Sequence, residues 1–333
     1  MKRRAVALLS GGLDSLLAVK IIMAQGIEVR ALTCMTHFGC DGHSSCGHDP
    51  REFADDLGFH VKLYHLGEEY VEMVKKPRFG YGKHMNPCLD CRLMMLAAAR
   101  EYMEAIDASF IITGEVVGQR PMSQRRDALA MIDRESGLKG LILRPLSAKL
   151  LPPTIPEMEG IVDREKLYAI KGRSRKVQME LAKQFGITKY PSPAGGCLLT
   201  DSRYSEKLRD LFHYVPDARV EEIHLLTTGR HFRISEQCKI IVGRDQAENE
   251  VLSRYTGICT ASCAVTDYPS PLTLVFGPTT PEERKRIAEI TARYSKAPWM
   301  AEARVRFVYS TGESEELIVK AAVDAQTLDA LRI

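Results

Sequence analysis

The sequence predicts an α/β fold, in which a doubly wound parallel sheet is followed by a C-terminal α+β region. Three observations support this prediction. Apolar runs alternate with helical segments through the first half of the chain, a glycine-rich turn follows the first run, and the pattern changes beyond residue 201. Alternating strands and helices are typical of parallel sheets, which bind ligands at the carboxyl ends of their strands.

The first half of the chain carries the alternating pattern. Strands are expected at residues 5–9, 28–34, 60–65, 109–113 and 140–144. Helices are expected at residues 14–24, 50–57, 89–106 and 124–132. Pro50 suits the first turn of the second of these helices. We interpret the long segment 66–88 as a mobile, lid-like loop.

The second half begins with a connector at Leu150–Ile161 that contains three prolines. A basic helix is predicted from Arg164 to Phe185 and ends at Gly186, which suits a helix C-terminus. Strands are then expected at 230–234, 239–242, 303–310 and 316–321, with helices near 244–254 and 280–294. The chain therefore divides into a domain at 1–150, a connector and basic helix at 151–204, and an α+β domain at 205–333.

Composition and charge limit the classes of protein to which this chain can belong. The 333 residues include 46 basic and 43 acidic side chains, so the net charge of +3 does not by itself imply a nucleic-acid partner. No apolar run is long enough to span a membrane. The apolar stretch after the basic N-terminus is too short for a signal peptide, which predicts a cytoplasmic protein. Nine cysteines in a cytoplasmic chain favour metal binding or sulfur chemistry over disulfides.

A glycine-rich turn, Ser10-Gly11-Gly12-Leu13-Asp14-Ser15, joins the first predicted strand to the first predicted helix. Glycines let the backbone approach a ligand closely, and free N–H groups at a helix N-terminus bind oxyanions. The serine hydroxyls add donors, and Asp14 is suited to a Mg²⁺ ion that bridges phosphates. No Gly-Lys-Ser/Thr follows, so this is not the Walker pattern. The alternative is an ordinary turn between strand and helix.

Cysteines in two distant motifs form the second candidate site. Asn86-Pro87-Cys88-Leu89-Asp90-Cys91 places two thiols where a loop meets a helix, whose N-terminus favours the thiolate. About a hundred residues later, Cys197 follows Gly195 and Gly196. Three thiolates are one ligand short of a closed zinc or iron–sulfur site and leave one metal position open. The alternatives are a structural zinc site with a fourth ligand such as His84, and three unrelated buried cysteines.

These motifs together resemble the tRNA thiouridine synthases of the PP-loop ATP pyrophosphatase superfamily, over about residues 4–200. The Asn-Pro-Cys and Gly-Gly-Cys segments are similar to those of the 2-thiouridine synthases. The run from Thr113 to Gln119, with Ser123-Gln124 and Arg144-Pro145-Leu146, is closer to the 4-thiouridine synthases. The resemblance implies that residues 1–150 are a PP-loop domain with an adenine nucleotide alpha hydrolase-like fold.

The resemblance also implies a two-step reaction. The uridine carbonyl oxygen attacks the α-phosphate of ATP, pyrophosphate leaves, and sulfur then displaces AMP. Cys88, Cys197 and Asp14 would be the catalytic residues. The residues implied to bind pyrophosphate and Mg²⁺ are Ser10, Gly11, Gly12, Asp14 and Ser15. Those implied to line the nucleotide pocket are Thr113, Gly114 and Gln119. The alternative for Thr113 and Gly114 is that they only lead the chain from a strand into a loop.

Members of this superfamily deliver sulfur in two ways. One group uses a persulfide carrier cysteine and a partner that closes a disulfide, and another holds a [4Fe–4S] cluster on three cysteines. Cys88, Cys91 and Cys197 match the three-cysteine pattern, which favours the cluster. An open iron is a Lewis acid that keeps sulfide deprotonated. If Cys91 is dispensable, the persulfide route through Cys88 and Cys197 is preferred.

The chain departs from both branches of the superfamily. Because the PP-loop begins at residue 10, we expect the chain to lack the N-terminal RNA-binding domains of the 4-thiouridine synthases, and we expect no all-β ending like that of the 2-thiouridine synthases. Instead, the segment from Lys239 to Glu250 resembles the strand–turn–helix of the NFACT RNA-binding domain. The alternative is an ordinary β-turn-α unit.

We expect tRNA as the partner, with sulfide or a persulfide carrier protein as sulfur donor and no membrane association; the oligomeric state stays open, with a homodimer as one option. The candidates for RNA phosphate contacts are Lys171, Arg173, Arg175 and Lys176; the alternative is a solvated helix face. Three other functions stay open: the same chemistry on a small molecule, a PP-loop adenylating ligase or amidotransferase with a structural metal site, and a non-catalytic RNA-binding protein. Cys34, Cys40 and Cys46 fit no standard zinc spacing, and we interpret their segment as a substrate loop or a structural feature.

Overall fold

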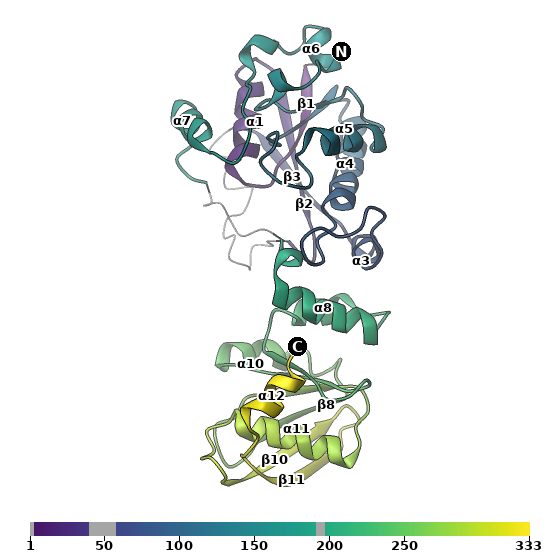
Figure 1. Cartoon of the computed structure of the whole chain (residues 1–333), viewed down its shortest axis with the longest axis vertical. Helices are drawn as coiled ribbons and strands as arrows, with labels where there is room; N and C mark the ends of the chain where they lie inside the picture. Colours follow the sequence, from purple (N-terminus) through teal and green to yellow (C-terminus); the bar gives the residue numbers. More distant parts are fainter. Residues whose placement is uncertain (1–2, 40–57, 191–196) are drawn as a thin grey trace. The chain divides into compact units, whose positions relative to one another are not determined.

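The structure is a computed structural model that describes residues 3–39, 58–190 and 197–333. The helix predicted at 50–57 lies outside the described residues. The chain divides into two compact units, Met1–Thr200 and Asp201–Ile333, and each unit has its own sheet and hydrophobic core (Figure 1).

The first unit is built on a five-stranded sheet in the order β3-β2-β1-β4-β5. Every neighbouring pair of strands in it is parallel. The strands are β1 (Arg4–Leu8), β2 (Glu28–Met35), β3 (His60–His65), β4 (Phe110–Thr113) and β5 (Ile142–Leu143). This order reverses direction at β1, and the predicted doubly wound parallel sheet is confirmed.

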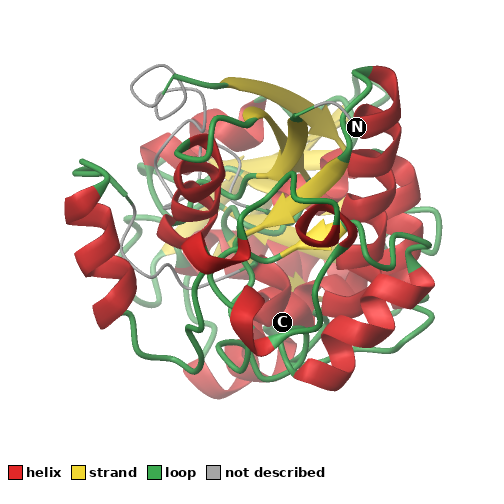
Figure 2. Ribbon diagram, turned by 90° about the horizontal axis from the view of Figure 1, so that it is seen from above, coloured by secondary structure: helices red, strands yellow, loops and turns green. Residues whose placement is uncertain are grey.

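Helices cover both faces of this sheet (Figures 1 and 2). Helix α1 (Leu13–Met23) packs with α7 (Lys176–Gln184) on one face, in a core that includes Leu16 and Leu181. Helices α4 (Cys88–Ala105) and α5 (Arg126–Glu135) pack on the other face. Since β1 is buried on both faces, its sequence is almost continuously apolar, as expected for a central parallel strand.

Two segments of the first unit differ from the prediction. Residues 66–88 are not only a loop, because they contain helix α3 (Glu68–Lys75), which buries Tyr70 and Val74. The basic segment 164–185 is not one helix. Only α7 is α-helical, and Gly172 before it has a φ of +80°, which lies in the left-handed region and interrupts a right-handed helix.

The remaining elements of the first unit are short. They are the 3₁₀ helices η1 (Ala148–Leu150), η2 (Arg164–Lys166) and η3 (Leu198–Thr200), and the single-turn helix α6 (Ile155–Met158). Helix α6 lies within the predicted proline-rich connector and begins with a capping box formed by Thr154 and Glu157.

The second unit contains a six-stranded antiparallel sheet in the order β11-β10-β8-β9-β7-β6. Its strands are β6 (Arg230–Arg233), β7 (Lys239–Val242), β8 (Ala261–Val265), β9 (Thr273–Phe276), β10 (Glu302–Tyr309) and β11 (Ser314–Lys320). Its helices are α8 (Ser202–Tyr214), α9 (Val220–Leu225), α10 (Gln246–Ser253), α11 (Pro281–Arg293) and α12 (Ala325–Leu331). The predicted α+β character is confirmed, while β8, β9, α8, α9 and α12 were not predicted.

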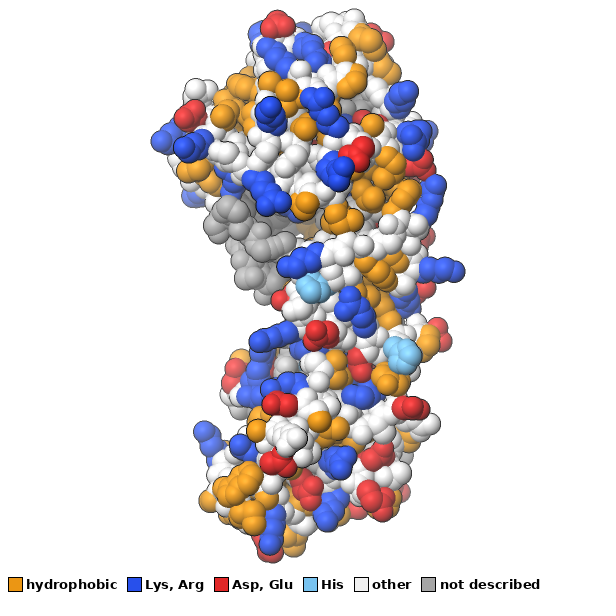
Figure 3. All heavy atoms as spheres, in the orientation of Figure 1, with side chains coloured by type: hydrophobic (Ala, Val, Ile, Leu, Met, Phe, Trp, Pro, Cys, Tyr) orange, Lys and Arg blue, Asp and Glu red, His pale blue; other side chains and the backbone are white. Residues whose placement is uncertain are grey.

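Two clusters of apolar side chains surround the second sheet. The larger joins α11 to the strands through residues such as Ile287 and Phe307, and the smaller joins α9 and α10 through Leu225 and Leu252. Within the described parts of both units, no helix is both long and apolar enough to cross a membrane. On the face drawn in Figure 3, Lys and Arg side chains are scattered over the first unit and alternate with acidic ones on the second.

Candidate nucleotide and thiol site

The turn between β1 and α1 has the geometry of an anion cradle. Gly11 has a φ of +72°, a left-handed conformation that favours glycine. The Ser15 hydroxyl donates a hydrogen bond to the Gly12 carbonyl oxygen at 2.7 Å. The Ser10 hydroxyl oxygen lies 3.3 Å from the hydroxyl oxygen of Ser15. Helix α1 has no side chain capping its N-terminus. Its first N–H groups are therefore suited to bind an oxyanion.

Asp14 faces the loop that follows β4. Its Oδ2 atom accepts a hydrogen bond from Gln119 Nε2 at 3.0 Å. Its Oδ1 atom is buried and accepts no hydrogen bond from any described residue. A buried carboxylate oxygen without a partner is unfavourable unless a ligand binds it, so Asp14 has the donor chemistry that Mg²⁺ requires.

Gly114 brings the loop after β4 against the start of α1. A Cβ atom at this position would lie 2.5 Å from the Ser15 nitrogen, which leaves room only for glycine. Thr113 is 2% exposed and its hydroxyl donates to Glu115. Thr113 therefore supports the loop from within, while Gly114 and Gln119 contact the PP-loop itself.

Glu115 lies at the centre of a buried ion network that sequence reasoning missed. Its oxygens lie 3.2 Å from Arg92 Nε and 3.0 Å from Arg144 Nε, and Arg144 also binds both oxygens of Asp133. Burial alone would raise the pKa of Glu115, but the two arginines outweigh it and leave the pKa lowered. The network fixes Arg92, which directly follows Cys91.

The three predicted cysteines lie in one region of the first unit. Cys88 and Cys91 occupy the first turn of α4. Two backbone hydrogen bonds place the segment after Cys197 beside that turn: Leu198 N donates to Phe38 O, and Met85 N donates to Leu199 O. Cys88 and Cys91 each raise the pKa of Cys197, so the thiols are within electrostatic reach of one another. Gly195 and Gly196 lie outside the described residues.

Each of the three thiols has contacts within the protein. Tyr70, 2% exposed on α3, donates its hydroxyl to Cys91 Sγ at 3.1 Å. Cys197 Sγ lies 3.5 Å from the carbonyl oxygen of Phe38. The side chain of Asn86 forms a hydrogen bond that lowers the pKa of Cys88. Tyr70 is a second residue that the sequence did not single out.

Burial opposes the thiolate form that the N-terminus of α4 is expected to favour. Burial raises the pKa of Cys88 and Cys91, and it raises the pKa of Cys197 to about 12. The positive charges of Arg92 and Arg120 lower the pKa of Cys88, but burial outweighs them. The free thiols are therefore protonated at neutral pH.

Arg120 connects the two halves of the site. Its charge lowers the pKa of both Cys88 and Cys197, so it lies close to these thiols. It directly follows Gln119, which binds Asp14 of the PP-loop. The loop after β4 therefore reaches both the first turn of α1 and the thiols.

The segment that contains Cys34, Cys40 and Cys46 lies only partly within the described residues. Cys34 lies at the end of β2 close enough to Cys91 for the two to interact, and burial raises its pKa to about 12. Cys40 and Cys46 lie outside the described residues. Across the described ranges, no three His, Cys, Asp or Glu side chains are arranged to hold a metal ion.

The candidate RNA-binding residues lie beside the loop that carries Gln119. Lys171 pairs with Val117 in an isolated parallel bridge, and Gly172 N donates to Val117 O at 2.8 Å. Lys171 and Arg173 precede α7 and are exposed. Arg175 is half-buried, and its Nε atom has no hydrogen-bond partner in the described structure.

Comparison with known proteins supports the resemblance drawn from the motifs. Residues 1–149 match the family model described as thiamine biosynthesis protein (ThiI), and residues 229–331 match that of the NFACT protein RNA binding domain. The first unit is thus PP-loop thiouridine synthase-like and the second NFACT-like, as the sequence indicated.

Curated relatives match over part of their length. The tRNA-specific 2-thiouridylase MnmA of Sulfurimonas denitrificans is 29% identical over 121 residues, which cover 35% of this chain and 36% of the relative. The probable tRNA sulfurtransferase of Thermococcus kodakarensis is 29% identical over 152 residues, 43% of this chain and 36% of the relative. The chain thus spans about a third of each relative.

A crystal structure of a 4-thiouridine synthetase–RNA complex with bound ATP is 22% identical to this chain. The match has a TM-score of 0.35 and covers 55% of this chain and 50% of that one.

Proposed function

We propose that this protein is an ATP-dependent sulfurtransferase that replaces a uridine carbonyl oxygen in tRNA with sulfur. The observation that carries the proposal is the loop after β4. Gln119 binds Asp14 of the PP-loop, and the next residue, Arg120, lies near Cys88 and Cys197. A nucleotide site and a group of thiols are thereby linked within one unit, as adenylation followed by sulfur transfer requires.

The first step uses the PP-loop. The uridine oxygen attacks the α-phosphorus of ATP and pyrophosphate leaves. The N-terminus of α1 and the serine hydroxyls bind the pyrophosphate oxygens, and Asp14 Oδ1 is the oxygen that would bind Mg²⁺. The metal would neutralise the charge that develops on the leaving group.

The second step uses the thiols. Sulfur adds to the activated carbon of the base and AMP leaves. Arg120 and Arg92, whose charges lower the pKa of Cys88, are placed to stabilise negative charge on sulfur and on the departing phosphate. Because the free thiols are protonated, loading the site with metal or sulfur would release protons.

We further propose that Cys88, Cys91 and Cys197 hold a [4Fe–4S] cluster. The donor set fits the cluster in type and number, because three neighbouring thiols are what such a cluster takes from the protein when one iron stays open. The described side chains do not form a ready metal group, so the thiols must turn toward one another on loading. Bound there, the cluster would supply a Lewis-acidic iron for sulfur.

The NFACT-like second unit supports RNA as the carrier of the uridine, since its match is to an RNA-binding domain. The exposed Lys171 and Arg173 add positive charge beside the nucleotide loop. Both features favour tRNA over a small-molecule acceptor.

The proposal is tested by nucleoside analysis of tRNA incubated with the anaerobically reconstituted protein, ATP, Mg²⁺ and sulfide. Thiouridine is expected with the wild type and not with Cys197→Ser. Cys259→Ser is the matched control, because Cys259 lies in the second unit, where its thiol donates to the Thr256 carbonyl oxygen. Full thiolation by Cys197→Ser would refute a sulfur-handling role for Cys197, and absence of thiouridine with the wild type would refute the function.

A further inference from the structure

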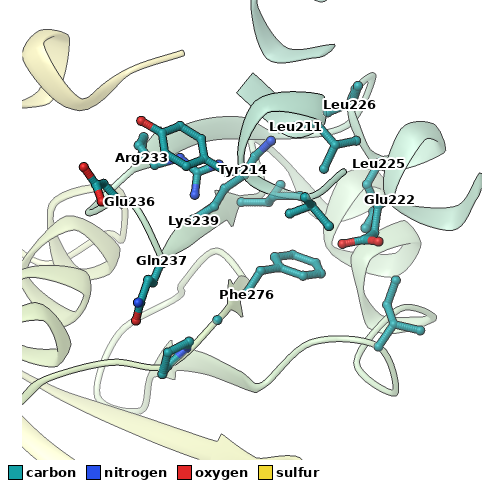
Figure 4. A pocket seen from close by; sticks show the side chains of 15 residues that line it. Leu211, Tyr214, Glu222, Leu225, Leu226, Arg233, Glu236, Gln237, Lys239 and Phe276 are labelled. Carbon is teal, nitrogen blue, oxygen red and sulfur yellow. The ribbon is translucent and has the colours of Figure 1, made fainter. Parts of the chain in front are cut away.

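The second unit contains a pocket of about 420 Å³ that the proposed sulfur chemistry does not use. It lies among α8, α9, β6, β7 and the end of β9, and Figure 4 shows the side chains that line it. Its walls are largely apolar or aromatic, with Leu211 and Tyr214 on α8 and Phe276 at the end of β9. Two cations, Arg233 and Lys239, also line it.

These two cations share one carboxylate. Asp210 accepts hydrogen bonds from Arg233 Nε at 2.9 Å and from Nη2 at 2.6 Å, which engages both of its oxygens. Lys239 Nζ lies 3.4 Å from Asp210 Oδ2, beyond the range of a well-formed hydrogen bond. Lys239 is 6% exposed, and no described atom accepts a hydrogen bond from its Nζ.

Besides Asp210, the neighbouring charged groups do not offset the positive charge of Lys239. Lys207 is a further cation, and its Nζ donates to the carbonyl of Leu226. His231 is fully buried, and burial lowers its pKa well below the ordinary value, so its ring is neutral. The result is an excess of buried positive charge, which destabilises the folded unit unless an anion binds.

The rest of the pocket indicates what kind of anion fits. Arg233 stacks on the Tyr214 ring at 4.2 Å, so a flat cation–aromatic pair forms one wall. Glu222 and Glu236 lie at opposite ends of the pocket, and Gln237 lies beside Glu236 (Figure 4). Carboxylate and amide oxygens accept hydrogen bonds from sugar hydroxyls and base amino groups. Glu222 already accepts a hydrogen bond from Arg219 N at the start of α9. Glu236 and Gln237 are therefore the acceptors that a ligand with a flat ring, hydroxyls and a phosphate would use.

We propose that this pocket binds a nucleotide, either free or as one unstacked residue of an RNA strand, and that Lys239 receives its phosphate. The proposal goes beyond the thiolation chemistry and rests on the second unit alone. Its binding readout is independent of sulfur transfer, so it can fail while the proposed function stands.

The test uses the full chain, with UMP and a short fluorescent single-stranded RNA as separate probes. UMP is chosen because it lacks the adenine base of the ATP proposed for the first unit. Lys239→Met removes the charge and keeps the length of the side chain. Lys207→Met is the matched control, since Lys207 is a neighbouring cation that does not line the pocket.

Lys239→Met should weaken binding of the probe at least about tenfold, which is the loss expected for a charge-assisted hydrogen bond. Its midpoint of thermal unfolding should be equal to or higher than that of the wild type, because an uncompensated buried charge has been removed. Lys207→Met should bind like the wild type. A lower thermal midpoint without loss of binding would mean that Lys239 is only structural and would overturn the proposal.

The two probes identify the source of the nucleotide. RNA binding that depends on Lys239, without binding of UMP, assigns an RNA residue. Binding of UMP with no tighter binding of RNA assigns a free nucleotide. If neither probe responds to Lys239→Met, or if inorganic phosphate competes as well as UMP, the pocket does not recognise a nucleotide and the proposal is wrong.

Discussion

Gln119 donates a hydrogen bond from Nε2 to Oδ2 of Asp14 at 3.0 Å and so joins the loop after β4 to the first turn of α1, 105 residues apart in the chain. The bond fixes one carboxylate oxygen, while the other is buried and has no hydrogen-bond partner in the described ranges. Asp14 is therefore oriented by one neighbour and left with one oxygen for a ligand.

Asp14→Asn should impair the ATP half-reaction with little effect on folding. The amide keeps the volume of the side chain and an oxygen that can accept from Gln119, but it removes the charge that attracts Mg²⁺. The lost interaction between the Asp14 carboxylate and Mg²⁺ is worth roughly 1.5–3 kcal/mol. Its loss should lower the rate of pyrophosphate release at limiting Mg²⁺ by at least about tenfold. A titration of pyrophosphate release with Mg²⁺ measures this, and an unchanged Mg²⁺ dependence would exclude Asp14 as the ligand.

Gly114→Ala should destabilise the first unit and weaken ATP binding together. The added Cβ would lie 2.5 Å from the Ser15 nitrogen, so α1 or the loop after β4 must shift. Overpacking of this kind costs about 1–3 kcal/mol. Gly257→Ala is the control, because a Cβ there meets nothing within 4 Å and its φ lies outside the left-handed region. Denaturant unfolding measures the stability of both variants, and ATP titration measures their affinity for ATP. Equal stability and equal affinity of the two variants would contradict the close contact at Gly114.

The sequence predicted the strands and helices whose apolar side chains recur with the period of a strand or a helix. The strand expected at 60–65 is β3, His60–His65, and the strand expected at 28–34 differs from β2 by one residue. The basic helix could not be bounded correctly, because Lys171 pairs with Val117 and Gly172 takes a left-handed conformation. That pairing is a tertiary contact, which a local pattern does not reveal.

For the site, the sequence supplied the motifs but not the contacts between them. The C-x-x-C spacing predicted two neighbouring thiols, yet it gave no sign that burial would outweigh the helix N-terminus and raise the pKa of Cys88. Tyr70 and Arg120 were missed because each reaches the thiols from a distant segment. The position of Arg92 near the thiols could have been predicted, since Arg92 directly follows Cys91.

Replacing Arg173, Arg175 and Lys176 together by alanine should weaken tRNA binding and flatten its salt dependence. Each lost phosphate contact reduces the slope of log K against log salt by about 0.7–0.9. The KM for ATP should not change. Arg100→Ala is the control, because Arg100 pairs with Glu104 on the exposed face of α4. An unchanged slope with a raised KM for ATP would show that these residues serve the nucleotide instead.

Lys239 should make the stability of the second unit depend on pH. Burial lowers its pKa from 10.5 to about 8, with Arg233 and Lys207 adding to the effect and Asp210 opposing it. Between these values the unfolded chain binds more protons, so the free energy of unfolding rises with pH and is lowest below about pH 8.

Lys239→Met should remove this part of the pH dependence. At pH 7 the variant should be more stable by on the order of 3 kcal/mol, as an upper bound from about 1.4 kcal/mol per pKa unit. A smaller rise should remain, because the pKa of Lys207 is also lowered to about 8. Denaturant unfolding of both proteins from pH 7 to 10 measures the difference. Parallel pH profiles of the two proteins would contradict a charged, buried Lys239.

We propose that ATP cleavage between the α and β phosphates is coupled to thiolation of tRNA through Asp14 and the three cysteines. The most direct measurement is the ratio of AMP to thiouridine in one reaction with tRNA, ATP, Mg²⁺ and sulfide. Equal amounts of both products are expected with the wild type, and loss of thiouridine is expected with Cys88→Ser or Cys197→Ser. Formation of ADP instead of AMP, or AMP without thiouridine in the wild type, would contradict it.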